Sequence, residues 1–227
     1  MKKILNSLFC GFLILNIIAL AGFSSGLFSK PGRQVWNFDN DKVGGLPAGW
    51  KSAETNGKGQ LARWQIVKDG AKSGRQSLAI TETKNTRSTY NLAIAEGTSY
   101  KDLEFSVWVK AISGKEDQGG GPIWRVKDAN NYYIARWNPL EKNFRIYVVQ
   151  NGQRKQLADR GVSIDSKVWR KITISHKNDK IEAYIDNKID IYATDGTFEN
   201  AGMIGLWTKA DAAAAFDSIE VKKLPAN

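Results

Sequence analysis

Three arginines are the residues of this sequence best suited to hold an oxygen-rich group. Arg125, Arg136 and Arg145 occur in three consecutive short runs in which polar and apolar residues alternate. A guanidinium donates hydrogen bonds in a fixed planar fork, so it can hold one carboxylate or two hydroxyl groups. Arginines gathered on one surface repel one another unless a ligand or neighbouring carboxylates neutralise them. Both explanations stay open, and the candidate counter-ions are Glu116, Asp128 and Glu141.

The positions of the arginines follow from a predicted meander of four strands. We expect four-residue loops at 128–131 and 139–142, and a two-residue turn at 151–152, because Asn and Gly tolerate positive φ. This register places Arg136 opposite Arg145, and Arg125 opposite Ile134. Side chains alternate between the two faces of a strand. The apolar face, which we expect in the core, carries Trp124, Val126, Tyr133, Ala135, Trp137, Phe144, Ile146, Val148 and Leu157.

The opposite face of this meander is polar, basic and rich in aromatic residues. A one-residue bulge in any strand would change the assignment, because it moves every later side chain to the other face. The face is composed of Arg125, Lys127, Tyr132, Arg136, Asn138, Asn143, Arg145, Tyr147, Arg154 and Gln156. From it, and from two other segments, we select these candidate ligand-binding residues: Arg125, Tyr132, Arg136, Asn138, Arg145, Tyr147, Trp207, Lys209, Glu116 and Asp117.

Each candidate has a less specific interpretation. Tyr132 and Trp207 could stack on the apolar face of a sugar ring, whereas Trp124, Trp137 and Trp169 are expected in the core. Glu116 and Asp117 lie in a Gly-rich segment, which is either the rim of a binding cleft or a solvated turn. The glycines do not form a phosphate loop, because no Gly-Lys-Ser/Thr ending follows them.

Catalytic and metal-binding patterns are sparse. Glycoside hydrolysis usually needs two carboxyl groups that flank the scissile bond, and no Glu-x-Asp-x-x-Glu pattern occurs here. His176 is the sole histidine and is expected at the surface, which weakens a zinc site or a His-dependent triad. No cofactor is expected. Calcium is an option because oxygen ligands are common at loop tips, although no Asp-x-Asp-x-Asp-Gly loop occurs.

The N-terminus has the pattern of a secretory signal peptide. Lys2 and Lys3 precede an apolar stretch, and Ala19 and Ala21 suit a signal peptidase, so residues 1–21 are predicted to be removed. The alternative is an uncleaved membrane anchor, which would be the chain's contact with a membrane. Residues 22–33 form a Gly/Ser/Pro tether, and residues 34–227 are predicted to form one domain. We expect a periplasmic or secreted location.

The domain is predicted to be all-β. Short alternating runs are separated by turn residues every 8–12 positions or so, which is typical of a sandwich or barrel. The formal net charge is +10, but the basic residues are spread along the chain and no nucleic-acid motif is present, so nucleic acid is not expected as a partner. The predicted strands are 34–38, 64–68, 76–81, 90–94, 103–110, 123–127, 132–137, 144–150, 168–176, 180–186, 201–208 and 216–221.

Several of these segments resemble a known group of proteins. They are 114–121, Trp124-Arg125, 131–141, Phe38-Asp39, Gly49-Trp50, 200–202, 205–211 and Phe216-Asp217. The chain from Trp36 to Val221 resembles bacterial exported proteins of the concanavalin A-like lectin/glucanase superfamily, and in particular the domain named for 3-keto-disaccharide hydrolases. The resemblance implies a two-sheet antiparallel jelly-roll sandwich whose concave face often serves as a sugar cleft.

Three functions are compatible with these features. The leading hypothesis is an exported carbohydrate-binding domain that uses the concave face, with an acidic glycan as one option for the ligand. The second is a glycoside hydrolase that acts on an unusual (3-keto) glycoside, and the third is a structural or adhesive envelope protein. Whether the chain is an enzyme stays open, because the paired-carboxylate motif is missing and there is a single histidine.

Overall fold

The computed structural model describes residues 32–68, 70–87 and 89–225. The predicted signal peptide and nearly all of the tether lie outside the described residues. Within these ranges no helix is long and apolar enough to cross a membrane. The single helical element described is the 3-10 turn η1 (Thr55–Gly57).

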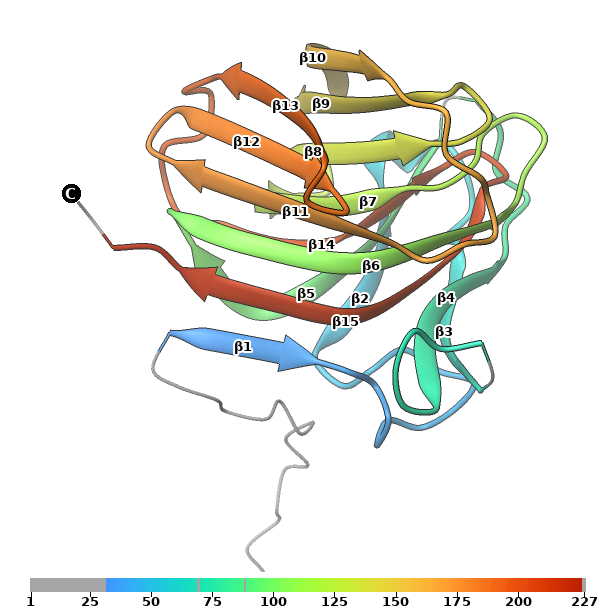
Figure 1. Ribbon diagram of the computed structural model, residues 1–227. Coiled ribbons are helices and arrows are strands. Elements are labelled where there is room, and N and C mark those ends of the chain that lie inside the picture. Colours follow the sequence, from blue (N-terminus) through green and yellow to red (C-terminus); the bar gives the residue numbers. More distant parts are fainter. Residues whose placement is uncertain (1–31, 69, 88, 226–227) are drawn as a thin grey trace, which may run out of the picture.

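The described chain folds into two antiparallel sheets packed face to face (Figure 1). Sheet A has the order β13-β12-β11-β6-β15-β4-β3, and β1 also pairs with β15. Its strands are β1 (Arg33–Trp36), β3 (Arg63–Lys68), β4 (Gln76–Glu82), β6 (Leu103–Ser113), β11 (Arg170–Lys177), β12 (Lys180–Ile185), β13 (Ile189–Thr194) and β15 (Ala213–Lys223).

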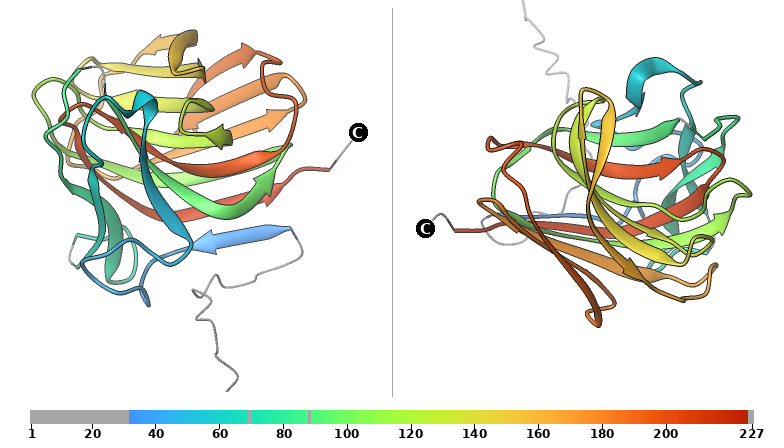
Figure 2. Two further views of the ribbon diagram at one scale, coloured as in Figure 1. Left: turned by 180° about the vertical axis from the view of Figure 1, so that it is seen from behind. Right: turned by 90° about the horizontal axis from the view of Figure 1, so that it is seen from above.

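Sheet B lies behind sheet A in Figure 1 and has the order β10-β9-β8-β7-β14-β5-β2. The right-hand view of Figure 2 shows the two layers from above. The strands of sheet B are β2 (Trp50–Glu54), β5 (Tyr90–Tyr100), β7 (Gly121–Asp128), β8 (Asn131–Asn138), β9 (Asn143–Gln150), β10 (Gln153–Gly161) and β14 (Gly202–Lys209).

The predicted all-β sandwich is confirmed, and most predicted strands lie within a residue or a few of the observed ones. Strands β2 and β13 were not expected. The alanines at 213–215 open strand β15, where small side chains lie between β6 and β4.

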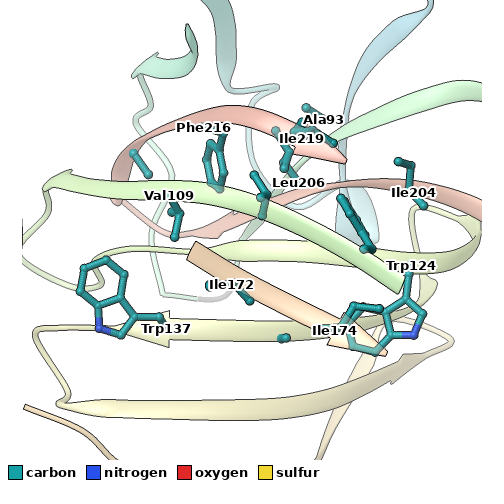
Figure 3. Packing of buried hydrophobic residues seen from close by; sticks show 14 of the residues in the cluster. Ala93, Val109, Trp124, Trp137, Ile172, Ile174, Ile204, Leu206, Phe216 and Ile219 are labelled. Atoms are coloured by element: carbon teal, nitrogen blue, oxygen red, sulfur yellow. The ribbon is translucent and has the colours of Figure 1, made fainter. Parts of the chain in front are cut away.

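The core lies between the sheets and is built from large apolar side chains of both (Figure 3). Trp124 and Trp137 of sheet B pack in the same cluster as Ile172 and Phe216 of sheet A, and all four are fully buried. Trp169, expected in the core, lies outside it. Its Nε1 donates to the carbonyl of Gly70 at 3.2 Å, and the ammonium of Lys110 lies 5.1 Å from the ring centroid.

The predicted register of β8, β9 and the start of β10 is confirmed. Arg136 pairs with Arg145, Asn138 with Asn143, and Tyr147 with Gln156. Strand β7 differs, because a bulge lies between Trp124 and Asp128. At this bulge Arg125 adopts a φ of 47°, and Ile123, rather than Arg125, pairs with Ile134.

Candidate functional site

The face of sheet B that points away from the core, here called the outer face, is apolar at its centre. Val126 belongs to this cluster, although the alternation placed it in the core, because the bulge in β7 reverses its direction. All members are buried, so this face is not the open polar cleft that the sequence predicted. The cluster consists of Leu92, Ile94, Ile123, Val126, Tyr132, Ile134, Tyr147, Val149 and Trp207.

Tyr132 cannot serve as a sugar-stacking platform in this structure. Its side chain is 0 % exposed, and its hydroxyl shares a 2.7 Å hydrogen bond with the hydroxyl of Thr55. Thr55 in turn donates to the carbonyl of Ala129 at 2.7 Å, which ties η1 to the β7–β8 turn. Tyr132 is therefore a buried structural residue of the outer face, covered by η1. The prediction that it contacts a ligand is wrong.

Arg125 was also predicted to bind a ligand, and the structure contradicts this. The bulge turns its fully buried guanidinium toward three backbone carbonyls, of Lys101 at 2.8 Å, Phe198 at 2.7 Å and Asn178 at 2.9 Å. Asp102 lies 3.3 Å from Nη2. Burial lowers the pKa of Arg125, and the nearby Asp102 opposes that effect. Arg125 is a structural clamp between loops.

A polar network occupies one end of the outer face. Strands β8 and β9 supply Arg136, Asn138, Asn143 and Arg145, β14 supplies Lys209, and loops supply Asp117 and Glu141. Arg136 is at its centre: Nη1 lies 3.6 Å from Asp117 Oδ2, and Nη2 lies 2.6 Å from Glu141 Oε2. The counter-ions that the sequence left open are therefore Glu141 and Asp117, neither of which lies directly across the ladder from Arg136.

Asp117 is held in the network from both sides. Its Oδ1 accepts a hydrogen bond from Asn138 Nδ2 at 2.9 Å, and its Oδ2 accepts one from Lys209 Nζ at 3.0 Å. Its side chain is 1 % exposed. Burial raises the pKa of Asp117, and the charges of Arg136 and Lys209 act in the opposite direction.

The Gly-rich loop delivers Asp117 because another carboxylate anchors it. Asp211 accepts hydrogen bonds from the backbone N–H groups of Lys115, Glu116 and Asp117, at 2.6, 3.0 and 3.1 Å. The side chain of Glu116 is exposed and makes no hydrogen bond or ion pair with the described residues, so the structure does not bring it into the network. The glycine of this segment that opens β7, Gly121, permits close packing, since a Cβ there would lie 1.9 Å from the carbonyl oxygen of Ala135.

Glu141 is the network's more accessible carboxylate. It accepts hydrogen bonds from Asn143 Nδ2 at 3.0 Å and Arg145 Nη1 at 3.2 Å besides that from Arg136. Partial burial opposes its ionised form, but the hydrogen bonds from Asn143 and Arg136 and the charge of Arg136 outweigh burial and lower the pKa to about 2. Its side chain is 36 % exposed, so a ligand can reach it.

Beside the network, three aromatic rings surround one more arginine. The guanidinium of Arg154, from β10, lies 4.4 Å from the ring centroid of Tyr147, 5.1 Å from that of Tyr90 and 5.9 Å from that of Trp207. We call Tyr90, Tyr147 and Trp207 the aromatic cradle. Trp207 is fully buried, so the prediction that a sugar stacks on its ring is wrong, as it is for Tyr132; Tyr147 is nearly buried, whereas Tyr90 and Arg154 are partly exposed at the rim.

The strand pairing connects the network to the cradle. Arg145 pairs with Arg136 on β8, Gly121 of β7 pairs with Trp207 of β14, and the pairing of Ile123 with Ile134 sets Gly121 opposite Arg136. These residues form one row across the sheet. Glycine has no side chain, so none separates Arg136 from Trp207 along this row.

Seven of the ten predicted residues thus come together at one end of the outer face: Asp117, Arg136, Asn138, Arg145, Tyr147, Trp207 and Lys209. The prediction did not select Glu141 or Asn143 as ligand contacts, and it missed Tyr90 and Arg154. The same alternation that selected Tyr147 also places Arg154 on this face, and Tyr90 pairs with Lys209 across the ladder.

The structure also bears on the predicted surface position of the histidine and on the predicted option of a calcium site. His176 is not at the surface: it is 0 % exposed, and Trp124 Nε1 donates to its Nδ1 at 2.8 Å. Burial and the charge of Arg125 lower its pKa to about 3. Within residues 32–68, 70–87 and 89–225 no three His, Cys, Asp or Glu side chains are grouped so as to hold a metal ion. Calcium binding stays a prediction.

Comparison with known proteins gives relatives in structure and none in sequence. No protein-family model and no curated protein matches the chain. The carbohydrate-binding module CBM66 from Bacillus subtilis superposes with a TM-score of 0.61 at 20 % identity, over 77 % of this chain and 96 % of that module. A β-1,3-1,4-glucanase (lichenase) from a mouse hindgut metagenome superposes with a TM-score of 0.59 at 12 % identity, over 85 % of this chain and 100 % of the enzyme.

The chain has the concanavalin A-like jelly-roll fold. Domain 4 of AbnA, an extracellular arabinanase from Geobacillus stearothermophilus solved with arabinotriose, shares it with a TM-score of 0.52 at 14 % identity, over 83 % of this chain and 90 % of that domain. At such identities the likeness concerns the fold, and function has to be argued from the site.

Proposed function

We propose that the protein binds a carbohydrate at the polar network and the aromatic cradle. The observation that carries the proposal is the row from Arg145 to Trp207, in which fixed donors lie beside aromatic rings on one face. Sugars present hydroxyl groups at their edges and apolar C–H faces, so a sugar site combines planar hydrogen-bonding groups with rings. Three solved structures of the same fold, one a carbohydrate-binding module, support this reading.

The network is organised in advance of a ligand. Arg136 and Asp117 are 1 % exposed and fixed by hydrogen bonds, whereas Lys209, Glu141 and Arg145 are 15 %, 36 % and 27 % exposed at the rim. A ligand that binds the rim therefore meets side chains that have already lost most of their conformational freedom, which reduces the entropic cost of binding.

A glycan array followed by titration calorimetry on the array hits tests the proposal. Lys209→Met removes a rim donor and is expected to weaken binding of a hit about tenfold, the typical value of a charged hydrogen bond. Lys110→Met is the matched control, because Lys110 lies on sheet A and also donates a single hydrogen bond, to Gly70. Equal affinities for the two variants would place the binding site elsewhere, and an array without hits would refute the proposal.

Hydrolysis of an unusual glycoside, such as a 3-keto glycoside, is the second candidate. One observation favours it: Asp117 and Glu141 flank Arg136, and their pKa values are shifted in opposite directions, up for Asp117 and down to about 2 for Glu141. Such a pair can supply an acid and a base. Against this, both oxygens of Asp117 already accept hydrogen bonds, and the side chain is buried.

The binding and hydrolysis proposals give different results in one assay. Incubation of each array hit with the protein, followed by mass spectrometry, detects cleavage directly. We expect no products from a binding module. Products that disappear in both Asp117→Asn and Glu141→Gln would establish hydrolysis. As a control, Asp165→Asn removes an exposed carboxylate in the β10–β11 connection, which lines a hollow with Ile185 and Ile189 of sheet A and makes no contact with the network.

The cellular location and the leader belong to the same proposal. An exported protein would meet glycans of the envelope or the medium, in agreement with the predicted signal peptide at residues 1–21. Mass spectrometry of the mature N-terminus tests this, with Gly22 as the expected first residue. Recovery of Met1 alone would favour the uncleaved anchor.

A further inference from the structure

Arg154 differs from the other cations of the site because no carboxylate accompanies it. Arg136 pairs with Asp117 and Glu141, Arg145 with Glu141 and Asp159, and Lys209 with Asp117. Within the described residues Arg154 has no ion pair and no side-chain hydrogen bond, and only the three rings of the aromatic cradle hold its guanidinium. Its charge is positioned but not neutralised.

The unpaired buried polar atoms of this region are all donors. They are Arg154 Nη1 and the Nε and Nη1 of Arg136, none of which has a hydrogen-bond partner among the described residues, although Arg136 Nη1 lies 3.6 Å from Asp117 Oδ2. A buried donor without an acceptor costs about 1–3 kcal/mol, so native proteins seldom leave several together. What the region lacks is an acceptor, and an anionic one would satisfy the donors best.

Arg136 and Arg154 both lie near the ring of Tyr147. The guanidinium carbon of Arg154 is 4.4 Å from the ring centroid of Tyr147, and that of Arg136 is 6.0 Å from the same centroid. Arg136 is fully buried and already paired with Asp117 and Glu141, whereas Arg154 is partly exposed on edge strand β10. A ligand therefore meets Arg154 first, and its planar fork matches a carboxylate in two parallel hydrogen bonds.

We propose that the sugar bound at this site carries a carboxylate, as a uronic acid does, and that Arg154 on the aromatic cradle receives that group. The inference rests on the proposed glycan binding and names the class of glycan. The cradle holds the guanidinium in place before binding, and the carboxylate supplies the counter-ion that Arg154 lacks among the described residues. Tyr90, the partly exposed ring of the cradle, lies beside the bound sugar.

Matched pairs of charged and neutral sugars test the inference. The probes are trigalacturonate and its methyl ester, and a glucuronate trisaccharide and its methyl ester, titrated calorimetrically into the purified protein. In each pair the ester keeps the ring and its hydroxyl groups but removes the charge. For at least one pair we expect the acid to bind about ten to a hundredfold more tightly than the ester, as for one charged hydrogen-bonded pair.

Variants of strand β10 locate the effect. Arg154→Gln is expected to lower the affinity for the acid to that for the ester and to leave the ester unchanged, and Arg154→Lys is expected to be intermediate because it keeps the charge without the fork. Lys155→Gln is the control, since it removes the same charge from the next, exposed residue on the opposite face of β10. Thermal melting of each variant shows that it is folded.

The possible outcomes distinguish failure of the carboxylate inference from failure of the proposed glycan binding. Equal affinity for acid and ester, or binding of neutral glycans alone, overturns the carboxylate inference and leaves glycan binding intact. An equal loss in Arg154→Gln and Lys155→Gln also overturns it, because the overall positive charge then explains the attraction. If no probe and no glycan of the array binds, the proposed function fails and the inference fails with it.

Discussion

Arg125 and Arg136 lie on neighbouring strands of sheet B, and both are fully buried, but their surroundings differ. Arg125 donates to three backbone carbonyls and lies beside one carboxylate, so it joins loops. Arg136 forms ion pairs with two carboxylates, but its Nε and Nη1 make no hydrogen bond with the described residues and lie beside a row of polar and aromatic side chains. The hydrogen-bonding groups of Arg125 are all used within the protein, whereas Arg136 has donors that a ligand could use.

The comparison shows how one backbone irregularity separates a structural arginine from a candidate functional one. Both residues alternate correctly in a strand and were expected on the same face. The bulge at Arg125, with its φ of 47°, turns that side chain out of the row, and regular β8 keeps Arg136 in it. The following predictions test whether the two arginines differ in function as they do in contacts.

The largest expected effect is that of Arg125→Met. Removal of the guanidinium leaves three carbonyls without this donor and leaves Asp102 with only the backbone N–H of Asn178, so the free energy of unfolding should fall by about 3–5 kcal/mol, as when one member of a buried ion pair is lost. Urea denaturation measures it. Glycan affinity per folded molecule should stay unchanged, and a loss of affinity would mean that Arg125 also serves the site.

Arg136→Gln should affect both stability and binding. Asp117 keeps Asn138 and Lys209, and Glu141 is partly exposed, so the loss of stability should be smaller, about 1.5–3 kcal/mol. Glycan affinity, measured by calorimetry at a temperature where the variant is folded, should fall at least tenfold. Unchanged affinity would assign Arg136 the same purely structural role as Arg125.

The stability of the protein should depend on pH through His176, which accepts a hydrogen bond from Trp124 in the core near Arg125. Its pKa is lowered to about 3 in the folded protein from 6.5, so the unfolded chain binds the proton more readily. The contribution of neutral His176 to the free energy of unfolding is therefore complete above pH 6.5 and is lost as the pH falls from 6.5 toward 3. At pH 5 the loss is about 2 kcal/mol.

Urea denaturation at pH 8 and pH 5 checks this contribution. The difference in stability between the two pH values should shrink by about 2 kcal/mol in His176→Gln, which keeps an acceptor for Trp124 but does not titrate. The same difference in the variant and the wild type would show that His176 does not titrate on unfolding in this range.

The smallest effect on stability is expected for Arg145→Ala. Its partners Glu141 and Asp159 are 36 % and 40 % exposed, and ion pairs of this kind contribute less than about 1 kcal/mol. Arg145 nevertheless lies in the same row as Arg136, so glycan affinity should fall several-fold. Reduced stability together with unchanged glycan affinity in this variant would show that Arg145 is not part of the binding site.

The sequence by itself determined the fold class and most of the register. Period-two alternation, together with the four-residue loop at 139–142 and the Asn151-Gly152 turn, specified the pairing of β9 with β8 and with β10, because a slip of one residue would place charged side chains in the core. It therefore also determined that Arg136, Asn138, Arg145 and Tyr147 share one face. These are local consequences of chain geometry.

Only the tertiary structure decided which of these side chains are accessible and what neutralises them. The bulge in β7 and the burial of Tyr132 beneath η1 depend on contacts between segments distant in sequence. The same holds for Asp117, which reaches Arg136 because Asp211, ninety-four residues away in the chain, anchors its loop. Alternation assigns a side chain to a face, but its partners and its exposure depend on the packing of remote elements, which no local pattern encodes.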